Sequence, residues 1–159
     1  VAALRPEPAV LSPLALRVPP GWVRGSTDPR RLLPGSAGGT ATGSLAVPAA
    51  GRWTVDLGGS FARGFTVRID GRRVGAARFE LHNLGQYSRI GEVAFAAGAH
   101  RVEIQRDAVS LHPGSGSRLE ALGPLSLDRA GDHERLVTLA PANARRLCGR
   151  SLDWLELDS

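Results

Sequence analysis

The segment from Leu81 to Arg89 concentrates side chains that could bind a polar ligand. It reads Leu-His-Asn-Leu-Gly-Gln-Tyr-Ser-Arg, so one short stretch carries imidazole, amide, phenol and guanidinium groups. Planar polar side chains bridge neighbouring hydroxyl groups of a sugar, and an aromatic face packs against the C–H surface of its ring. We therefore predict a sugar-binding edge formed by His82, Asn83, Gln86, Tyr87 and Arg89.

A purely structural interpretation of this segment is also open. Asn83 and Gly85 would then only shape a turn, and Tyr87 would bury its ring and donate a hydrogen bond from its hydroxyl to the backbone. Arg63 follows Gly58-Gly-Ser-Phe61 in another loop and is expected to reach the same rim.

Two further arginines, Arg68 and Arg73, are brought together by a hairpin signal. Asp70-Gly71 lies between two alternating runs and is typical of a two-residue hairpin turn. The strand pairs that such a turn implies are Ile69 with Arg72, Arg68 with Arg73, and Val67 with Val74. Like charges that face each other across strands are unfavourable. Something must compensate for them, and the candidates are Glu80 or Glu103 from a neighbouring strand, or an anionic ligand.

The sequence lacks the motifs of common catalytic sites. No glycine-rich phosphate loop precedes a helix, no Gly-x-Ser-x-Gly elbow occurs, and Cys148 has no histidine nearby in sequence. The histidines, at positions 82, 100, 112 and 133, match no metal-ligand spacing. Enzyme activity is therefore not expected of this chain. His100 shares strand parity with Val102 and Ile104, which predicts a histidine at the edge of the core with its ring bonded to the backbone.

The elements that must position these side chains are short strands. Alternating segments between residues 51 and 127 are separated by turn residues at intervals of about 8–12 residues, without a helical period. In the first of them Trp53, Val55 and Leu57 share one face, which predicts that Trp53 belongs to the core. The pattern predicts an all-β fold, an antiparallel β-sandwich or jelly roll.

The first 50 residues contain eight prolines, which excludes long helices there. We expect this part to form a Pro/Gly-rich strap across the sandwich, with residues 1–14 as a linker or strap and residues 40–157 as the core of one domain covering 1–159. Trp22 is expected to anchor the strap or to form an exposed platform. The short strands expected outside the central region are Ala15–Val18, Trp22–Arg24, Gly43–Val47, Arg135–Leu139 and Ser151–Leu157.

The charge composition bears on the partners. All 20 basic residues are arginine, the formal net charge is +5 and the pI is near 11.1. The arginines form no cluster of five or more and only one tyrosine accompanies them, so nucleic acid is not an expected partner. Weak attraction to an anionic polymer or lipid is expected. The absence of methionine suggests a piece of a larger protein, and no apolar run approaches the roughly 18–20 residues that span a bilayer.

Four of these segments together resemble a known superfamily. They are Gly51-Arg-Trp-Thr-Val-Asp-Leu-Gly-Gly-Ser-Phe61, the Val-Arg-Ile-Asp-Gly-Arg hairpin, Ala97-Gly-Ala-His-Arg-Val102 and Leu122-Gly-Pro-Leu125. The chain resembles jelly-roll carbohydrate-binding modules of the galactose-binding-like superfamily over residues 40–157. More narrowly, it is similar to the extracytoplasmic domains of bacterial cell-wall glycosyltransferases such as actinobacterial arabinosyltransferases.

The resemblance implies a non-catalytic accessory domain that binds a cell-envelope glycan beside a parent membrane glycosyltransferase, on the extracytoplasmic face of the bacterial membrane. It also implies a structural calcium ion held in part by Asp153. From the residues alone, a different class stays open. The chain could be a structural or interaction domain that packs on its parent enzyme or dimerises, without a glycan site.

Overall fold

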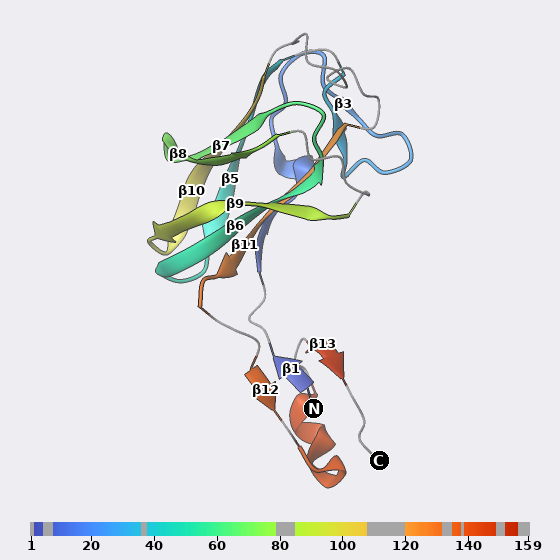
Figure 1. Ribbon diagram of the computed structural model, residues 1–159, viewed down its shortest axis with the longest axis vertical. Coiled ribbons are helices and arrows are strands. Elements are labelled where there is room, and N and C mark those ends of the chain that lie inside the picture. Colours follow the sequence, from blue (N-terminus) through green and yellow to red (C-terminus); the bar gives the residue numbers. More distant parts are fainter. Residues whose placement is uncertain are drawn as a thin grey trace.

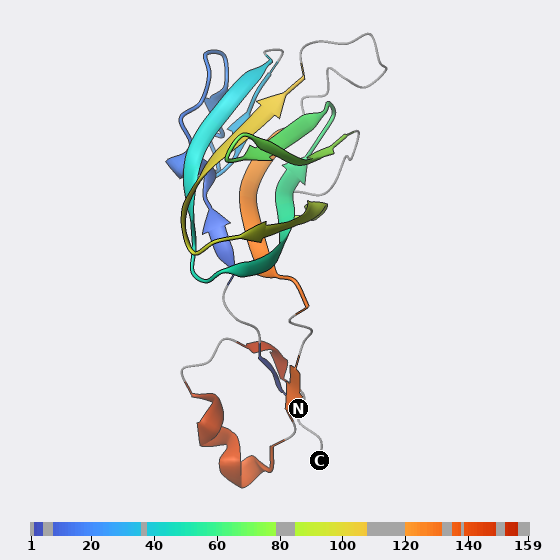
Figure 2. The ribbon, with the colours of Figure 1, turned by 90° about the vertical axis from the view of Figure 1, so that its left-hand side faces the viewer.

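The fold is an antiparallel β-sandwich of the jelly-roll type, as the sequence predicts. Two sheets pack face to face, and the view of Figure 2 shows them in profile. The computed structural model describes residues 2–4, 8–35, 38–78, 85–107, 120–131, 135–137, 139–148 and 152–155. Within these residues no helix is both long and apolar enough to cross a bilayer.

The larger sheet has six antiparallel strands. Their order is β3-β4-β11-β6-β9, and β2 also pairs with β11. The strands are β2 (Ala9–Leu11), β3 (Val23–Arg24), β4 (Leu32–Leu33), β6 (Gly51–Ser60), β9 (Tyr87–Phe95) and β11 (Ala121–Arg129). Strand β6 lies between β11 and β9 and buries Trp53, Val55 and Leu57 on its inner face, which confirms the alternation predicted for this segment.

The smaller sheet of the sandwich has four strands in the order β5-β10-β7-β8. They are β5 (Gly39–Val47), β7 (Phe65–Ile69), β8 (Arg72–Ala77) and β10 (Gly98–Arg106). Asp70 and Gly71 join β7 to β8 with φ angles of 51° and 77°, the left-handed conformations that this two-residue turn requires. The pairs Ile69–Arg72 and Arg68–Arg73 are confirmed.

The third predicted pair of the hairpin is wrong. Val67 lies opposite Gly75 instead of Val74, because a β-bulge inserts one residue between the second and third pairs. The bulge leaves Gly75 close to β9, where a Cβ at position 75 would collide with the carbonyl oxygen of Ile90. A residue without a side chain therefore allows the two sheets to approach each other along this side of the sandwich.

The tip of the same hairpin is fixed to β10 by side-chain contacts. His100 Nδ1 lies 2.6 Å from Asp70 Oδ2, and His100 Nε2 lies 2.9 Å from the carbonyl oxygen of Ala96. The second carboxylate oxygen of Asp70 accepts a hydrogen bond of 2.9 Å from the backbone N–H of Arg101. The predicted backbone contact of His100 is confirmed, and the carboxylate is an additional partner.

The proline-rich strap takes part in both sheets. Strands β2 and β4 pair with β11, and Arg17 forms an isolated bridge with Thr42 of β5. The strand expected over Ala15–Val18 is wrong: the 3₁₀ helix η1 (Pro13–Ala15) occupies its start, because Pro13 fixes φ and the Ser12 side chain accepts a hydrogen bond from the Leu14 N–H. Trp22 is 5% exposed, so it anchors the strap.

The core between the sheets combines aliphatic residues with an aromatic group and one buried ion pair. The centroid of the Phe65 ring lies 6.1 Å from the centroid of the Trp22 ring and 5.2 Å from the centroid of the Phe61 ring. Arg106 points inward from the end of β10 and pairs with Glu120, and both side chains are almost fully buried. Trp22 of the strap therefore belongs to the same hydrophobic core as the inner side chains of the two sheets.

A third sheet of three strands joins the two ends of the chain. Its order is β12-β1-β13, with β1 (Ala2–Leu4), β12 (Arg135–Val137) and β13 (Leu152–Leu155), and the 3₁₀ helix η2 (Pro141–Leu147) lies between β12 and β13 in the sequence. Figure 1 shows this sheet below the sandwich. The two C-terminal strands expected from the sequence are present as β12 and β13 within the residues that the structure describes. The assignment of one domain to residues 1–159 stays a prediction.

Candidate functional site

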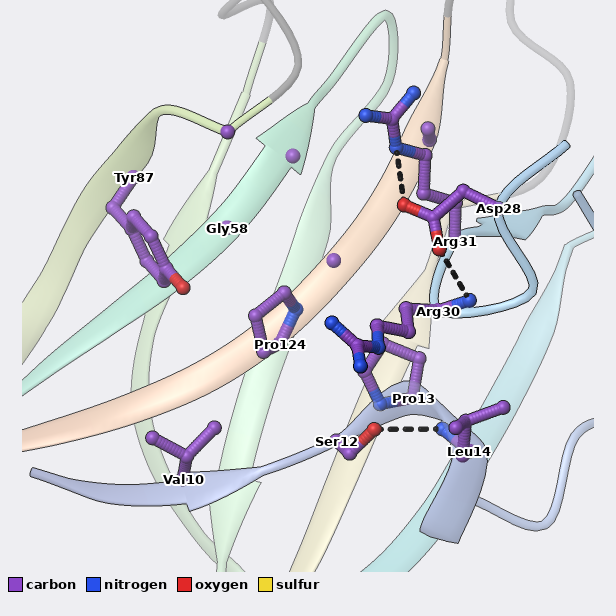
Figure 3. A pocket seen from close by; sticks show the side chains of 14 residues that line it. Val10, Ser12, Pro13, Leu14, Asp28, Arg30, Arg31, Gly58, Tyr87 and Pro124 are labelled. Atoms are coloured by element: carbon purple, nitrogen blue, oxygen red, sulfur yellow. Dashed lines mark hydrogen bonds and ion pairs between the residues drawn. The ribbon is translucent and has the colours of Figure 1, made fainter.

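A groove of about 520 Å³ lies on the outer face of the six-stranded sheet. Figure 3 shows Tyr87 and Arg30 on opposite sides of Pro124, which lies between them. The apolar side chains that line the groove are Val10, Pro13, Leu14, Tyr87 and Pro124, and the charged ones are Asp28, Arg30 and Arg31. Strand β9 supplies one wall, the strap supplies the other, and strands β6 and β11 form the floor.

Glycine makes the floor hollow. Gly58 and Gly59 of β6 lie beside Gly123 of β11, and the pairing register of these strands shifts at this point. A Cβ on Gly58 would lie 3.1 Å from Tyr87 Cε1 and 3.2 Å from Pro124 Cδ. A Cβ on Gly123 would lie 2.9 Å from the carbonyl oxygen of Gly58, so the two backbones approach closely only without side chains. The missing side chains of Gly58 and Gly123 therefore allow the close strand approach that forms this floor.

Tyr87 is the exposed aromatic residue of the groove. It begins β9 directly after Gly85 and Gln86, and 48% of its surface is exposed. Its ring lies against the Gly58 backbone, and Figure 3 shows the hydroxyl directed toward Pro124. The interpretation in which Tyr87 buries its ring is wrong, because about half of its surface is exposed.

The opposite wall is a tight turn of the strap. Asp28 Oδ1 accepts a hydrogen bond of 3.0 Å from the Arg30 backbone N–H, and Asp28 Oδ2 lies 3.3 Å from Arg31 Nε. Backbone bonds from Arg31 N to Asp28 O and from Gly25 N to Arg31 O close the turn. Within the described part of the chain the Arg30 side chain has no ion pair, and Figure 3 shows it extending into the groove. Its guanidinium is thus available to a ligand.

The structure brings some of the predicted ligand residues to the groove and its surroundings. Gln86 adjoins Tyr87, and its carbonyl oxygen accepts a 3.0 Å hydrogen bond from Gly59 N. Arg89 lies further along β9 on the same outer face, where its Nε is 3.7 Å from Asp56 Oδ1. His82 and Asn83 lie outside the described residues.

Asp56 gives this outer face an acidic patch beside the groove. Burial, the largest effect, raises the pKa of Asp56, and the negative charge of Asp128 raises it further, while Arg89 acts in the opposite direction. The Asp56 side chain is 16% exposed, against 69% for Arg89. Arg89 is therefore an exposed, solvent-screened partner for the largely buried carboxylate of Asp56 in β6.

The other predicted ligand residues lie elsewhere. Arg63 is 4% exposed, and its backbone N–H donates to Glu120 Oε1 at 3.1 Å. Arg68 and Arg73 lie on the outer face of the four-stranded sheet, opposite each other and across the core from the groove. Asp153 is in β13 of the third sheet, and its side chain lies outside the described residues. No group of three or more metal-binding side chains occurs among the residues that the structure describes.

The strap residues of the groove are not found by sequence reasoning. Val10, Leu14 and Arg30 belong to a segment that the sequence indicates only as irregular, and their position depends on the pairing of β2 with β11. One signal is present in the sequence. The Gly58-Gly59 and Gly123-Pro124 pairs occur inside runs that otherwise alternate, and such glycines in strands mark a bulge or a close backbone approach.

The fold is that of carbohydrate-binding jelly-roll modules. No protein-family model and no curated protein matches the sequence, whereas solved structures match the fold. A native family 35 carbohydrate-binding module from Clostridium thermocellum has a TM-score of 0.54 at 12% identity, over 79% of this chain and 100% of that chain. The CBM6cm-2 module of Cellvibrio mixtus lichenase 5A, solved with cellotriose, has a TM-score of 0.51 at 13% identity, over 77% and 97%.

A larger enzyme contains the same fold as one part. The GH26-CBM35 β-(1,4)-mannanase of Podospora anserina has a TM-score of 0.55 at 12% identity, over 79% of this chain. The present chain spans 28% of that mannanase chain. The resemblance of the sequence motifs to jelly-roll carbohydrate-binding modules is thus confirmed for the fold.

Proposed function

We propose that this chain is a non-catalytic carbohydrate-binding domain and that it holds a glycan in the groove on the six-stranded sheet. The exposed ring of Tyr87, above a floor of glycine and beside Pro124, is the observation that carries the proposal. A sugar presents apolar C–H faces and polar edges. An uncovered aromatic ring can pack against the apolar C–H face of a sugar, and side chains that donate hydrogen bonds can bind its hydroxyl groups.

The dimensions and chemistry of the groove support this proposal. Its volume of about 520 Å³ falls in the range of about 300–1,000 Å³ that is usual for sites of small ligands. Apolar side chains form most of its walls, and the Arg30 guanidinium offers donors for hydroxyl oxygens. Two strands of a packed sheet support Tyr87 and Pro124, so little conformational entropy is lost when a ligand binds.

The carboxylates of the groove also favour binding over catalysis. Hydrolysis of a glycoside by the usual routes needs two carboxyl groups on opposite sides of the bond. Among the described lining residues Asp28 is the one carboxylate, and it is occupied by the Arg30 N–H and the Arg31 side chain. We infer that the groove holds its ligand without changing it.

The biological setting that we propose rests on the resemblance of the sequence motifs. The ligand is a cell-envelope glycan, and the domain is an accessory part of an envelope glycosyltransferase on the extracytoplasmic side of a bacterial membrane. A structural calcium ion at Asp153 belongs to the same proposal. Carboxylate oxygens are ligands that calcium prefers, and Asp153 would supply one of them.

Binding to arabinans, galactans and mannans tests the proposed function. We expect one of these glycan classes to bind at near-physiological salt, with an affinity that falls at least about tenfold in Tyr87→Ala, because a central aromatic contact is removed. Val23→Ala is the matched control, since Val23 is 58% exposed but does not line the groove. Calorimetric titration gives the affinities, and thermal midpoints check that both variants are folded.

Two results would contradict a glycan site in this groove. One is the absence of binding to any of the polymers, and the other is an equal loss of affinity in Tyr87→Ala and Val23→Ala. The apolar groove would then favour the interaction-domain alternative. In that case light scattering should detect a dimer that Tyr87→Ala dissociates, because Val10, Leu14 and Tyr87 together would form a protein contact.

A further inference from the structure

A row of charged and polar side chains crosses the outer face of the four-stranded sheet. The strand register places Arg17 opposite Thr42, Thr42 opposite Glu103, Glu103 opposite Arg68, and Arg68 opposite Arg73. We call these five residues the arginine row. Neighbouring strands lie about 4.8 Å apart, so the row extends over about 19 Å.

The arginine row has an excess of positive charge. The carboxylate of Glu103, in its middle, lies 2.8 Å from Nη2 of Arg101, two residues earlier on the same strand. Within the described part of the chain Arg17, Arg68 and Arg73 form no ion pair. Arg68 and Arg73 are directly opposed, an arrangement that repels. Of the two acids expected to compensate for this repulsion, Glu103 is engaged by Arg101 and Glu80 lies outside the described residues.

A hollow continues the row at the edge of the sheet. It has a volume of about 470 Å³ and is lined by Ala15, Arg17, Thr42, Gly43 and Arg101. Two cationic side chains therefore border a concave surface at one end of the row, and the opposed pair Arg68–Arg73 lies at the other end. Cationic groups spaced along a line suit a ligand with several negative charges along its length.

The remaining side chains of this face restrict the kind of polyanion. The large exposed apolar residues of the described chain, Val10, Leu14, Val23 and Tyr87, belong to η1 and to strands of the other sheet. Among its described residues, this face therefore lacks the apolar anchors of a membrane-binding surface and the aromatic rings on which nucleic-acid bases stack. It has instead the hydroxyl and amide groups of Thr40, Ser44 and Gln105, which can bond to hydroxyl groups.

We propose that this face binds a polyanionic polysaccharide whose chain lies along the arginine row. Guanidinium groups pair with the carboxylates of the polymer, and the threonine and serine hydroxyls bond to its sugar hydroxyls. An anion between Arg68 and Arg73 would also remove their mutual repulsion. This site is independent of the groove, because it lies on the other sheet of the sandwich.

Polygalacturonate is a suitable probe, with the full chain titrated at 50 and 150 mM NaCl. We expect binding that weakens as salt is raised, and a further loss of at least about tenfold in the double variant Arg68→Gln/Arg73→Gln. The matched control is Arg145→Gln/Arg146→Gln, which removes the same net charge from exposed positions of η2. The control should retain most of the affinity. The Arg68/Arg73 variant should keep or raise its thermal midpoint, because a repulsive pair is relieved.

Several outcomes would overturn the proposal. These are no binding by the unmodified protein at 50 mM NaCl, an equal loss in the two double variants, or tighter binding to phosphatidylglycerol vesicles or duplex DNA than to polygalacturonate. A neutral glycan that binds through Tyr87 should be unaffected by Arg68→Gln/Arg73→Gln. The failure of this site is therefore distinguishable from failure of the groove.

Discussion

Replacing Asp70 with asparagine should destabilise the protein at pH 5.5 and have much less effect at pH 8.5. Both ring nitrogens of His100 face acceptors, the Asp70 carboxylate at 2.6 Å and the Ala96 carbonyl oxygen at 2.9 Å. A neutral imidazole carries one N–H and can donate to only one of them, whereas an imidazolium donates to both. The hydrogen bond to Asp70, followed by that to Ala96, therefore raises the pKa of His100.

The direction of the pH dependence follows from these pKa changes. Folding raises the pKa of His100, so protonated His100 stabilises the folded protein. This contribution to the free energy of unfolding is fully present below the pKa of the unfolded state, about 6.5, and is lost as pH rises through the pKa of the folded state. The hydrogen bond from His100 lowers the pKa of Asp70 below its ordinary value of 3.8. The stabilisation by the Asp70 carboxylate is lost as pH falls through this lowered pKa. The pair is therefore most stabilising between these two limits, which includes pH 5.5.

The magnitude is modest because the pair is partly open to water. The His100 side chain is 12% exposed and that of Asp70 is 51% exposed. Exposed ion pairs contribute about 0.2–1 kcal/mol. The low exposure of the His100 side chain places this pair near the upper end of that range, about 1 kcal/mol, and solvent screening at Asp70 keeps the contribution from exceeding it. For a chain of this size such a loss lowers the thermal midpoint by about 2–4 °C. Asparagine accepts the left-handed backbone of position 70, so the turn itself should persist.

Urea denaturation of both proteins at the two pH values measures the effect. Glu92→Gln is the control. It removes a carboxylate whose partner is Arg52, at 3.2 Å, so its effect should be the same at both pH values. Equal destabilisation by Asp70→Asn at pH 5.5 and pH 8.5 would refute the reasoning. So would a nuclear magnetic resonance titration in which His100 is neutral at pH 6.

Two further substitutions test the interior and the groove. Glu120→Gln should lower the free energy of unfolding by about 3–5 kcal/mol in urea denaturation, because it leaves the buried guanidinium of Arg106 without its counter-charge; a loss below about 1 kcal/mol would contradict this. Gly58→Val should fill the groove between Tyr87 and Pro124 and weaken glycan binding at least about tenfold, with the protein still folded. Unchanged affinity in that variant would show that the glycan binds elsewhere.

The parts of the fold that follow from short stretches of sequence are predictable. The Asp70-Gly71 turn is correct because its backbone angles are a local property of those two residues. The burial of Trp53 is correct because a strand with one buried face alternates. The bulge in β8 is not predictable in this way. It depends on how closely Gly75 approaches Ile90 of a strand in the other sheet.

The candidate site is less predictable because it combines distant segments. Tyr87 is identified from its neighbours in sequence, yet its exposure depends on Gly58 of β6 and on Pro124 of β11. Arg30 enters the groove only because β2 and β4 of the strap pair with β11. Arg63 shows the converse. This loop arginine, expected at the rim, is buried, and its backbone N–H donates to the carboxylate of Glu120, a residue distant in the sequence.

The two proposed surfaces should act independently, and the sandwich itself gives the reason. Each strand directs alternate side chains inward, so the core residues Leu57 and Val67 separate the groove behind β6 from the arginine row in front of β7. Substitutions at sites that share no partner are usually additive. A protein that carries both Tyr87→Ala and Arg68→Gln/Arg73→Gln should therefore lose each activity by the same factor as the separate variants. Coupling between the two losses would mean that one glycan passes around the edge of the sandwich and contacts both faces.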